Sequence, residues 1–198
     1  NFDEYDQDQW SLGYEFAHEF TPNLTFSQSA RYQRLDVNYR QLYLADPTED
    51  PSDSPGAYHR TAYLLDETLK QFVIDTRLTA KFQTGAAQHN LLAGVDYRHS
   101  KSVNHSDYLY AAGPMIDLLD PVYGLNFGAF PREGQASEKL SHTGIYLQDQ
   151  VELGRWRLTA GLRHDSAKSS LDVPGTDYDT TTDDSKLSWN AGVLYLFD

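Results

Sequence analysis

Two runs of acidic residues are the first places in this sequence where side chains could do chemistry, because carboxylate oxygens bind calcium. They are Asp46, Glu49, Asp50 and Asp53, and Asp177, Asp179, Asp183 and Asp184. Neither run has the central glycine and terminal glutamate of an EF-hand loop. We therefore expect both runs to be solvated acidic loops.

Histidine and serine offer no clearer catalytic pattern. His99 and His105 share one segment, but two ligands without a third rarely form a zinc site. The sequence has no HExxH motif, no G-x-S-x-G elbow and no cysteine, which excludes thiol nucleophiles and argues against a serine hydrolase. We predict that the protein is not an enzyme and has no resident metal or cofactor.

Composition narrows the class further. The chain of 198 residues carries 16 basic and 29 acidic residues, a net charge of −13, which argues against a nucleic-acid partner because phosphate binding needs a basic surface. Mean hydropathy is −0.62, and no apolar run approaches the roughly 18 residues of a membrane-spanning helix. Aromatic residues make up 13%, too many for a disordered acidic chain. Either a soluble all-β domain or a protein that crosses a membrane without helices remains.

Alternation of apolar and polar residues indicates β-strands. Between residues 10 and 20 every second residue is aromatic or apolar except His18, beginning with Trp10, Leu12 and Tyr14, and the residues between them are small or charged. Six further stretches show the same period of two, which is typical of half-buried strands. The seven stretches are 10–20, 24–33, 71–82, 89–98, 145–151, 156–165 and 187–197. We predict an all-β, antiparallel fold.

Short and long connections alternate strictly between these stretches. The short ones are 21–23, 83–88 and 152–155, and the long ones are 40–68, 99–139 and 166–186. All short turns then lie at one end of the sheet, as in outer-membrane barrels with short periplasmic turns and long extracellular loops. Ten steps of about 3.3 Å, tilted by about 40–45°, climb roughly 24 Å, the height of the apolar band of such barrels.

Aromatic side chains near the ends of the stretches fit the girdles that flank the apolar band. Phe20, Phe82, Trp156, Tyr195 and Phe197 lie beside the short turns, and Tyr32 and Tyr97 lie near the opposite ends. The same rings could instead form the core of a soluble β-sandwich. Two residues, Gln28 and Asp149, fit the lipid-facing side poorly.

Seven strands are not a complete barrel, because bacterial single-chain barrels have even strand numbers and an open sheet leaves unpaired edges in hydrocarbon. The inward set contains many charged residues, which suits a wide lumen holding water or a polar plug. They are Glu15, Arg31, Asp75, Arg77, Lys81, Asp96, Arg98, Arg157 and Arg163. We expect an internal piece of a larger barrel.

Four segments in series resemble TonB-dependent siderophore receptors, nearest to the ferrichrome-type (hydroxamate) branch. They are 89–97 (HNLLAGVDY), 143–150 (TGIYLQDQ), 156–165 (WRLTAGLRHD) and 192–198 (GVLYLFD). In that family a barrel of about 22 strands encloses an N-terminal plug, and TonB pulls the plug to release an iron-loaded siderophore inward. The resemblance implies that residues 1–198 are the middle part of such a barrel domain in the bacterial outer membrane, without the plug, the TonB box and the remaining strands.

The resemblance also directs attention to four tyrosines. If the alternation of the second stretch continues upward, Tyr39 and Tyr43 face the lumen near its outer mouth. Tyr108 and Tyr110 are the nearest matches to a family loop that carries ligand-contacting aromatics. Such rings hold the apolar body of a chelate while their hydroxyls meet its oxygens. The alternative is that all four only pack the long loops over the barrel.

The function implied is import of a ferric siderophore, with the siderophore, TonB through the plug domain, and outer-membrane lipid as partners. A related importer of cobalamin, haem or a metal–peptide remains an alternative, as does, in a different class, a soluble β-sandwich with binding loops.

Overall fold

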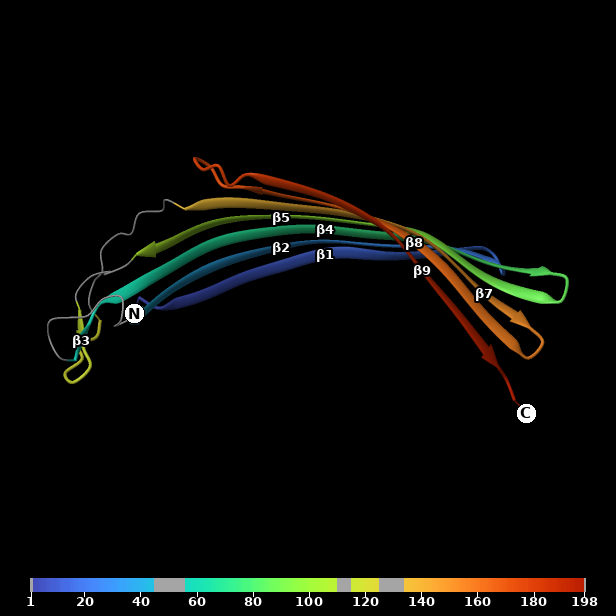
Figure 1. Cartoon of the computed structure of the whole chain (residues 1–198), viewed down its shortest axis with the longest axis horizontal. Helices are drawn as coiled ribbons and strands as arrows, with labels where there is room; N and C mark the ends of the chain where they lie inside the picture. The colour runs from blue at the N-terminus through green and yellow to red at the C-terminus, as the bar shows by residue number, and fades with distance from the viewer. Residues whose placement is uncertain (1, 45–55, 110–114, 125–133, 198) are drawn as a thin grey trace.

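The computed structural model describes residues 2–44, 56–109, 115–124 and 134–197. They form one curved antiparallel sheet of seven strands, in which each long strand pairs with the next along the chain (Figure 1). A separate two-stranded sheet joins the short strands β3 (Ala57–Tyr58) and β6 (Ile116–Asp117). The seven long strands are β1 (Glu4–Thr21), β2 (Leu24–Leu44), β4 (Arg60–Thr84), β5 (Ala87–Leu109), β7 (Gln135–Leu153), β8 (Trp156–Asp172) and β9 (Thr180–Tyr195).

Three two-residue hairpin turns join β1 to β2, β4 to β5 and β7 to β8 at one end of the sheet, called here the short-turn end. Gly85 and Gly154 occupy the first position of two of these turns, with φ of 61° and 56°. Such tight hairpins need a left-handed backbone that glycine adopts without steric cost. The other connections, including β3 and β6, lie at the opposite end, called the long-loop end (Figure 1). The predicted sorting of the connections is confirmed.

Strand register keeps the apolar residues on one face. Even-numbered residues of β1, β2, β4 and β8 share this apolar face with odd-numbered residues of β5, β7 and β9, and the remaining residues form the polar face. One row across all seven strands reads His18, Phe26, Leu78, Ala93, Leu147, Leu162 and Trp189. Several of these side chains are strongly exposed, Trp189 to 76%. This face needs an apolar surrounding that the described residues do not supply.

The two residues that fit the apolar face poorly have polar partners there. Gln28 accepts a hydrogen bond from the Tyr14 hydroxyl at 2.6 Å and donates to Thr76 Oγ1 at 2.9 Å. Asp149 lies 2.6 Å from Nδ1 of His89, whose ring stacks on Phe82. Pairing lowers the cost of a polar group on such a face, so neither residue contradicts the pattern.

The long connections are shorter than expected. Residues 40–44, 60–68, 99–109, 135–139, 166–172 and 180–186 were predicted as loops and belong instead to strands. The reason is that the outer parts of these strands carry polar residues on both faces, as at Asp66 and Glu67, so the hydrophobic alternation ends while the backbone ladder continues. The expectation of long loops over these residues is wrong.

No second sheet covers the apolar face within the described residues, since β3 and β6 contribute only two residues each at the long-loop end. The described residues that are buried are Arg60, Thr61 and Ala62, near the β3–β6 ladder, and Gly144 on β7. A soluble sandwich buries its apolar residues between two sheets, and the described residues do not form this arrangement. In the described part of the chain, no helix is long and apolar enough to span a membrane.

Candidate functional site

Tyrosine side chains gather on the polar face near the long-loop end. Tyr43 of β2 and Tyr108 of β5 come from strands separated by β4, and their ring centroids lie 6.1 Å apart. The residue opposite Tyr43 on β4 is Thr61, which is fully buried and small enough to let the two rings meet above it. The structure therefore brings together two of the four tyrosines singled out in the sequence.

Tyr39 lies in the same wall but contacts different rings. Its ring is 6.0 Å from that of Tyr5 and 5.8 Å from that of Tyr63, in edge-to-face arrangements that favour aromatic pairs. The Tyr39 hydroxyl donates a hydrogen bond to Gln41. We call Tyr5, Tyr39, Tyr43, Tyr63 and Tyr108 the tyrosine wall.

Tyr5 and Tyr63 were missed in the sequence, although a signal for both exists. Each has the parity of the polar-face residues of its strand, so continuing the alternation beyond the apolar stretch would have placed them there. Tyr110 and the acidic run of Asp46, Glu49, Asp50 and Asp53 lie outside the described residues.

Ring edges in the tyrosine wall are open to a ligand. Tyr108 is 62% exposed and Tyr43 is 37% exposed. Desolvation of the Tyr43 hydroxyl and its interaction with Tyr108 raise the pKa of Tyr43 to about 12. Tyr43 therefore stays a neutral hydroxyl at physiological pH and can donate a hydrogen bond to a carbonyl or hydroxamate oxygen.

The four strands that carry the tyrosine wall hold no lysine or arginine on the polar face beyond the row of Arg31, Val73 and Arg98. Glutamine, serine, asparagine and aliphatic residues fill these positions together with the tyrosines. The one carboxylate among them, Glu67, accepts a hydrogen bond of 2.6 Å from Ser102. Apart from Glu67, this part of the polar face is uncharged, and it is amphipathic.

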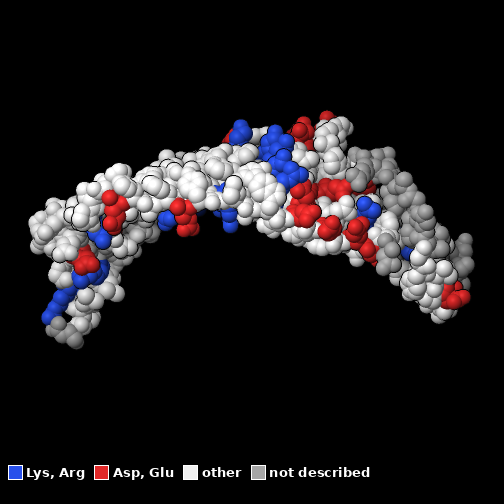
Figure 2. All heavy atoms as spheres, turned by 180° about the vertical axis from the view of Figure 1, so that it is seen from behind, with Lys and Arg blue, Asp and Glu red and all other residues white. Residues whose placement is uncertain are grey.

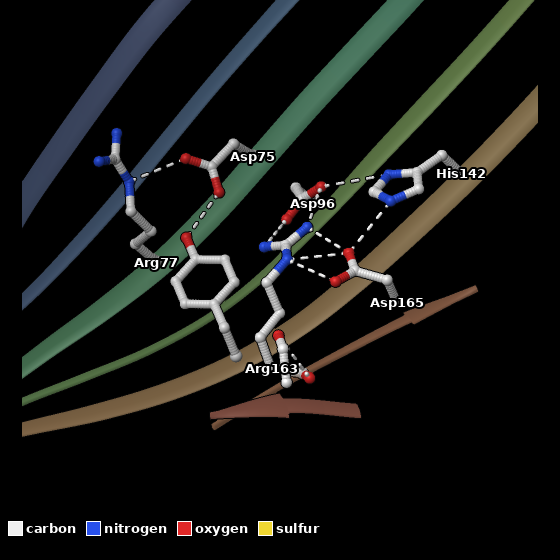
Figure 3. A network of polar contacts seen from close by, with 8 residues as sticks. Asp75, Arg77, Asp96, His142, Arg163 and Asp165 are labelled. Atoms are coloured by element: carbon white, nitrogen blue, oxygen red, sulfur yellow. Dashed lines mark hydrogen bonds and ion pairs between the residues drawn. The ribbon is translucent and has the colours of Figure 1, made fainter. Parts of the chain in front are cut away.

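Charged residues lie instead nearer to the short-turn end, where they pair with one another (Figure 3). Arg163 of β8 donates to Asp96 at 2.7 Å and to Asp165 at 2.8 Å. His142 of β7 lies 3.0 Å from Asp165. Asp75 of β4 accepts a hydrogen bond of 2.8 Å from Tyr146 and pairs with Arg77 at 2.9 Å. We call these seven residues the charged layer.

Two glycines make room for the charged layer. A Cβ atom on Gly94 would lie 2.3 Å from the ring of Tyr146, and one on Gly144 would lie 2.0 Å from a guanidinium nitrogen of Arg163. Both glycines are on the polar face, so any larger residue would displace a side chain of the layer. Within the described residues, no group of three or more His, Asp or Glu side chains could hold a metal ion. The arrangement is that of a polar wall held together by ion pairs and hydrogen bonds.

Two residues of the second acidic run, Asp179 and Asp183, have partners within or beside the connection between β8 and β9. Asp179 accepts a hydrogen bond of 2.9 Å from the backbone of Val173, and Asp183 lies 4.0 Å from Lys168. These carboxylates shape the connection between β8 and β9.

The whole chain, residues 1–198, matches the model of the family described as TonB dependent receptor-like, beta-barrel. It is 33% identical over 198 residues to the ferrioxamine B receptor of Salmonella typhimurium, covering all of this chain and 27% of that protein. It is 31% identical over 215 residues to the ferrichrome outer membrane transporter/phage receptor of Escherichia coli K12, covering 98% of this chain and 28% of that protein. The chain thus spans about a quarter of the length of these curated relatives.

Solved structures agree on the fold. The crystal structure of the ferric-catecholate import receptor Fiu from Escherichia coli K12, in its closed form, superimposes with a TM-score of 0.79 at 21% identity, covering all of this chain and 32% of that chain. The siderophore receptor PiuA from Acinetobacter baumannii gives a TM-score of 0.72 at 19% identity, covering 98% of this chain and 30% of that one.

Proposed function

Since this chain belongs to the TonB-dependent receptor-like β-barrel family, we propose that it forms part of the wall of an outer-membrane receptor that imports a ferric siderophore of the hydroxamate type. In this proposal the polar face lines the lumen, the apolar face meets lipid, and the remaining strands and the plug domain belong to the rest of the protein. TonB would act through that plug.

The uncharged tyrosine wall is the observation that carries the choice of ligand. Three singly charged hydroxamates cancel the charge of Fe³⁺, whereas three doubly charged catecholates leave the ferric complex strongly anionic. A site for an anionic complex would be expected to present lysine or arginine. On the polar face, the strands of the tyrosine wall present neither residue between the row of Arg31 and Arg98 and the long-loop end, and Glu67 would repel an anion.

Hydrogen bonding supports the same choice. A hydroxamate chelate exposes an apolar backbone and neutral oxygens, which suit aromatic rings with hydroxyl donors. Tyr43 is protonated at physiological pH, as tyrosines are at their ordinary pKa near 10, and its pKa is raised further to about 12. The ferrioxamine B and ferrichrome receptors, which share 33% and 31% identity with this chain, carry names of hydroxamate siderophores.

The test uses the full-length receptor that contains this chain, purified in detergent. Ferrioxamine B and ferrichrome should quench its intrinsic fluorescence and compete with each other, and ferric enterobactin should bind far more weakly. Tighter binding of ferric enterobactin, or quenching by cobalamin or haemin with none by either hydroxamate, would overturn the proposal.

The site assignment is tested separately from the function. Tyr108→Ala removes an exposed ring from the wall and should weaken hydroxamate binding roughly tenfold, as at a typical aromatic binding hot spot. Tyr178→Ala serves as the matched control, because Tyr178 is 75% exposed in the connection between β8 and β9. Equal affinities of both variants and the wild type would remove Tyr108 from the site while leaving the function intact.

A further inference from the structure

One carboxylate lies on the polar face beside the tyrosine wall. Glu67 of β4 is four residues from Tyr63 toward the short-turn end, and Leu65, which lies between them on the same face, is paired with Tyr39. Four residues of strand span about 13 Å. A ligand of siderophore size that covers the rings of Tyr39 and Tyr63 therefore extends close to Glu67.

The neighbours of Glu67 satisfy its carboxylate only in part. Ser102 of β5 donates a hydrogen bond of 2.6 Å to Oε1. Among the described residues, Oε2 has no hydrogen-bond partner and no lysine or arginine pairs with Glu67. The residues directly opposite are Val37 and Asn104, which are uncharged. A ligand that brings a positive charge would compensate the free-energy cost of this half-buried carboxylate.

Aliphatic side chains surround Glu67 on the same face. Leu65 and Leu69 lie at the polar-face positions before and after it on β4, and Val37 and Leu35 of β2 lie opposite Glu67 and Leu69. All four are half-buried. Such surroundings suit a ligand group with a hydrocarbon stem and a cationic tip, because the stem packs on the aliphatic surface while the tip meets the carboxylate.

Other charges near Glu67 have the same sign. Glu138 of β7 lies opposite Ser102 on the polar face. Arg31 and Arg98 are in the row of Val73, six residues of β4 away from Glu67, or about 20 Å. On the side of the molecule seen in Figure 2, acidic side chains likewise gather between the middle and the long-loop end, on the right. A negative potential at this end attracts cationic ligands.

We propose that the tyrosine wall prefers a ferric hydroxamate chelate with a free primary ammonium group, and that Glu67 determines this preference by accepting a hydrogen bond from that group. The inference rests on the proposed function. The iron centre of such a chelate is neutral, so the ammonium sets its net charge. Its alkyl arm, about as long and flexible as a lysine side chain, would lie along Leu65 and Leu69 with the ammonium at Oε2 of Glu67.

The test compares two chelates that differ only in this charge. Ferrioxamine B carries a primary ammonium at the end of an alkyl arm, and N-acetylation removes the charge without changing the iron coordination. The full-length receptor that contains this chain, purified in detergent, should bind ferrioxamine B roughly tenfold more tightly than its N-acetyl form, as expected for one charge-assisted hydrogen bond. Fluorescence quenching measures both dissociation constants.

Glu67→Gln keeps the side-chain length and an acceptor for Ser102 but removes the charge. In this variant the affinity for ferrioxamine B should fall roughly tenfold, to that of the N-acetyl form, while binding of the N-acetyl form and of ferrichrome stays unchanged and shows that the variant is folded. The matched control is Glu15→Gln, which removes the same charge from the polar face of β1 in the row of Asp75. This control should keep the wild-type preference.

Two kinds of failure are distinguishable. A wild type that binds both forms of ferrioxamine B equally, or a Glu67→Gln variant that keeps the wild-type ratio of affinities, would overturn this inference and leave the proposed function standing. A wild type that binds neither form and no ferrichrome would overturn the proposed function, and this inference with it.

Discussion

Replacing Leu147 with arginine tests the assignment of the two faces most directly. Leu147 is 47% exposed on the apolar face. Phe82 and His89 form an aromatic pair near the short-turn end, and Val151 is the β7 residue in their row. Phe72 and His99 lie ten residues nearer to the long-loop end, and Ser141 is the β7 residue in that row. Leu147 lies close to the midpoint of Val151 and Ser141, so an arginine there would sit near the middle of the hydrocarbon.

The expected cost follows from this height. An arginine on the lipid face of a barrel costs about 2–4 kcal/mol at the midplane and nearly nothing at the interfaces. Leu147→Arg should therefore lower the free energy of unfolding by about 2–4 kcal/mol. The assay is urea unfolding of the full-length receptor in phosphatidylcholine vesicles, followed by tryptophan fluorescence.

Gln148→Arg is the matched control, because the next residue on the strand points to the polar face at almost the same height. Its neighbours on the adjacent strands are Leu92 and Gly161. We expect a loss below about 1 kcal/mol, since the arginine reaches a wet lumen. Equal losses in the two variants, or a greater loss for Gln148→Arg, would refute the assignment of lipid and lumen.

Three further predictions concern single contacts. Gly144→Ala should destabilise the receptor by about 1–3 kcal/mol in the same unfolding assay, because the new methyl group would displace Arg163 from Asp96. Gly192→Ala is the control: the nearest contact of its new methyl group would be 4.0 Å away, so stability should change by less than about 0.5 kcal/mol. Similar losses in the two variants would contradict this role of Gly144. His89→Ala should lower the free energy of unfolding by about 2 kcal/mol, because Asp149 loses its partner on the apolar face. Adding Asp149→Ala should restore most of this stability. A double variant that is less stable than His89→Ala would contradict the pairing. Desolvation raises the pKa of Tyr43 to about 12 in the folded chain, whereas the unfolded chain releases this proton near pH 10. The free energy of unfolding should therefore fall between about pH 10 and 12, and it should fall less in Tyr43→Phe. An identical pH dependence of the urea midpoints in the wild type and the variant would contradict this prediction.

Most of the sequence signal for the fold comes from the part of each strand that crosses the apolar band. Wherever one face must be apolar, as at Trp10, Leu12 and Tyr14, the alternation is unmistakable, and the antiparallel barrel fold, the seven strands and the sorting of connections predicted from it are confirmed. The family expected from four motifs is confirmed as well. Beyond the band both faces meet water, so the hydrophobic alternation disappears from the sequence. The predicted strands are therefore up to eleven residues too short at this end, as in β5, which is predicted to end at residue 98 and ends at Leu109.

The candidate site lies in that region of faded signal, which explains what was found and what was missed. Tyr39 and Tyr43 followed from continued alternation, but the meeting of Tyr43 with Tyr108 depends on β4 lying between their strands with the small Thr61 at the crossing point. The sequence does not single out Tyr5, because its neighbours are acidic and show no hydrophobic alternation. Pairings across three strands depend on register, and no single segment of sequence contains it.

On the polar face the tyrosine wall lies near the long-loop end and the charged layer lies nearer to the short-turn end, and this division has a physical consequence for the proposed import. In the charged layer each described arginine, Arg77 and Arg163, is already held by carboxylates, so a ligand could bind there only by breaking ion pairs. Binding at the tyrosine wall would break no ion pair. A neutral chelate would cover exposed rings, displace water from apolar surface and accept hydrogen bonds from protonated hydroxyls. Under the proposed function we therefore expect recognition at the tyrosine wall, while the charged layer keeps a fixed polar surface toward the lumen.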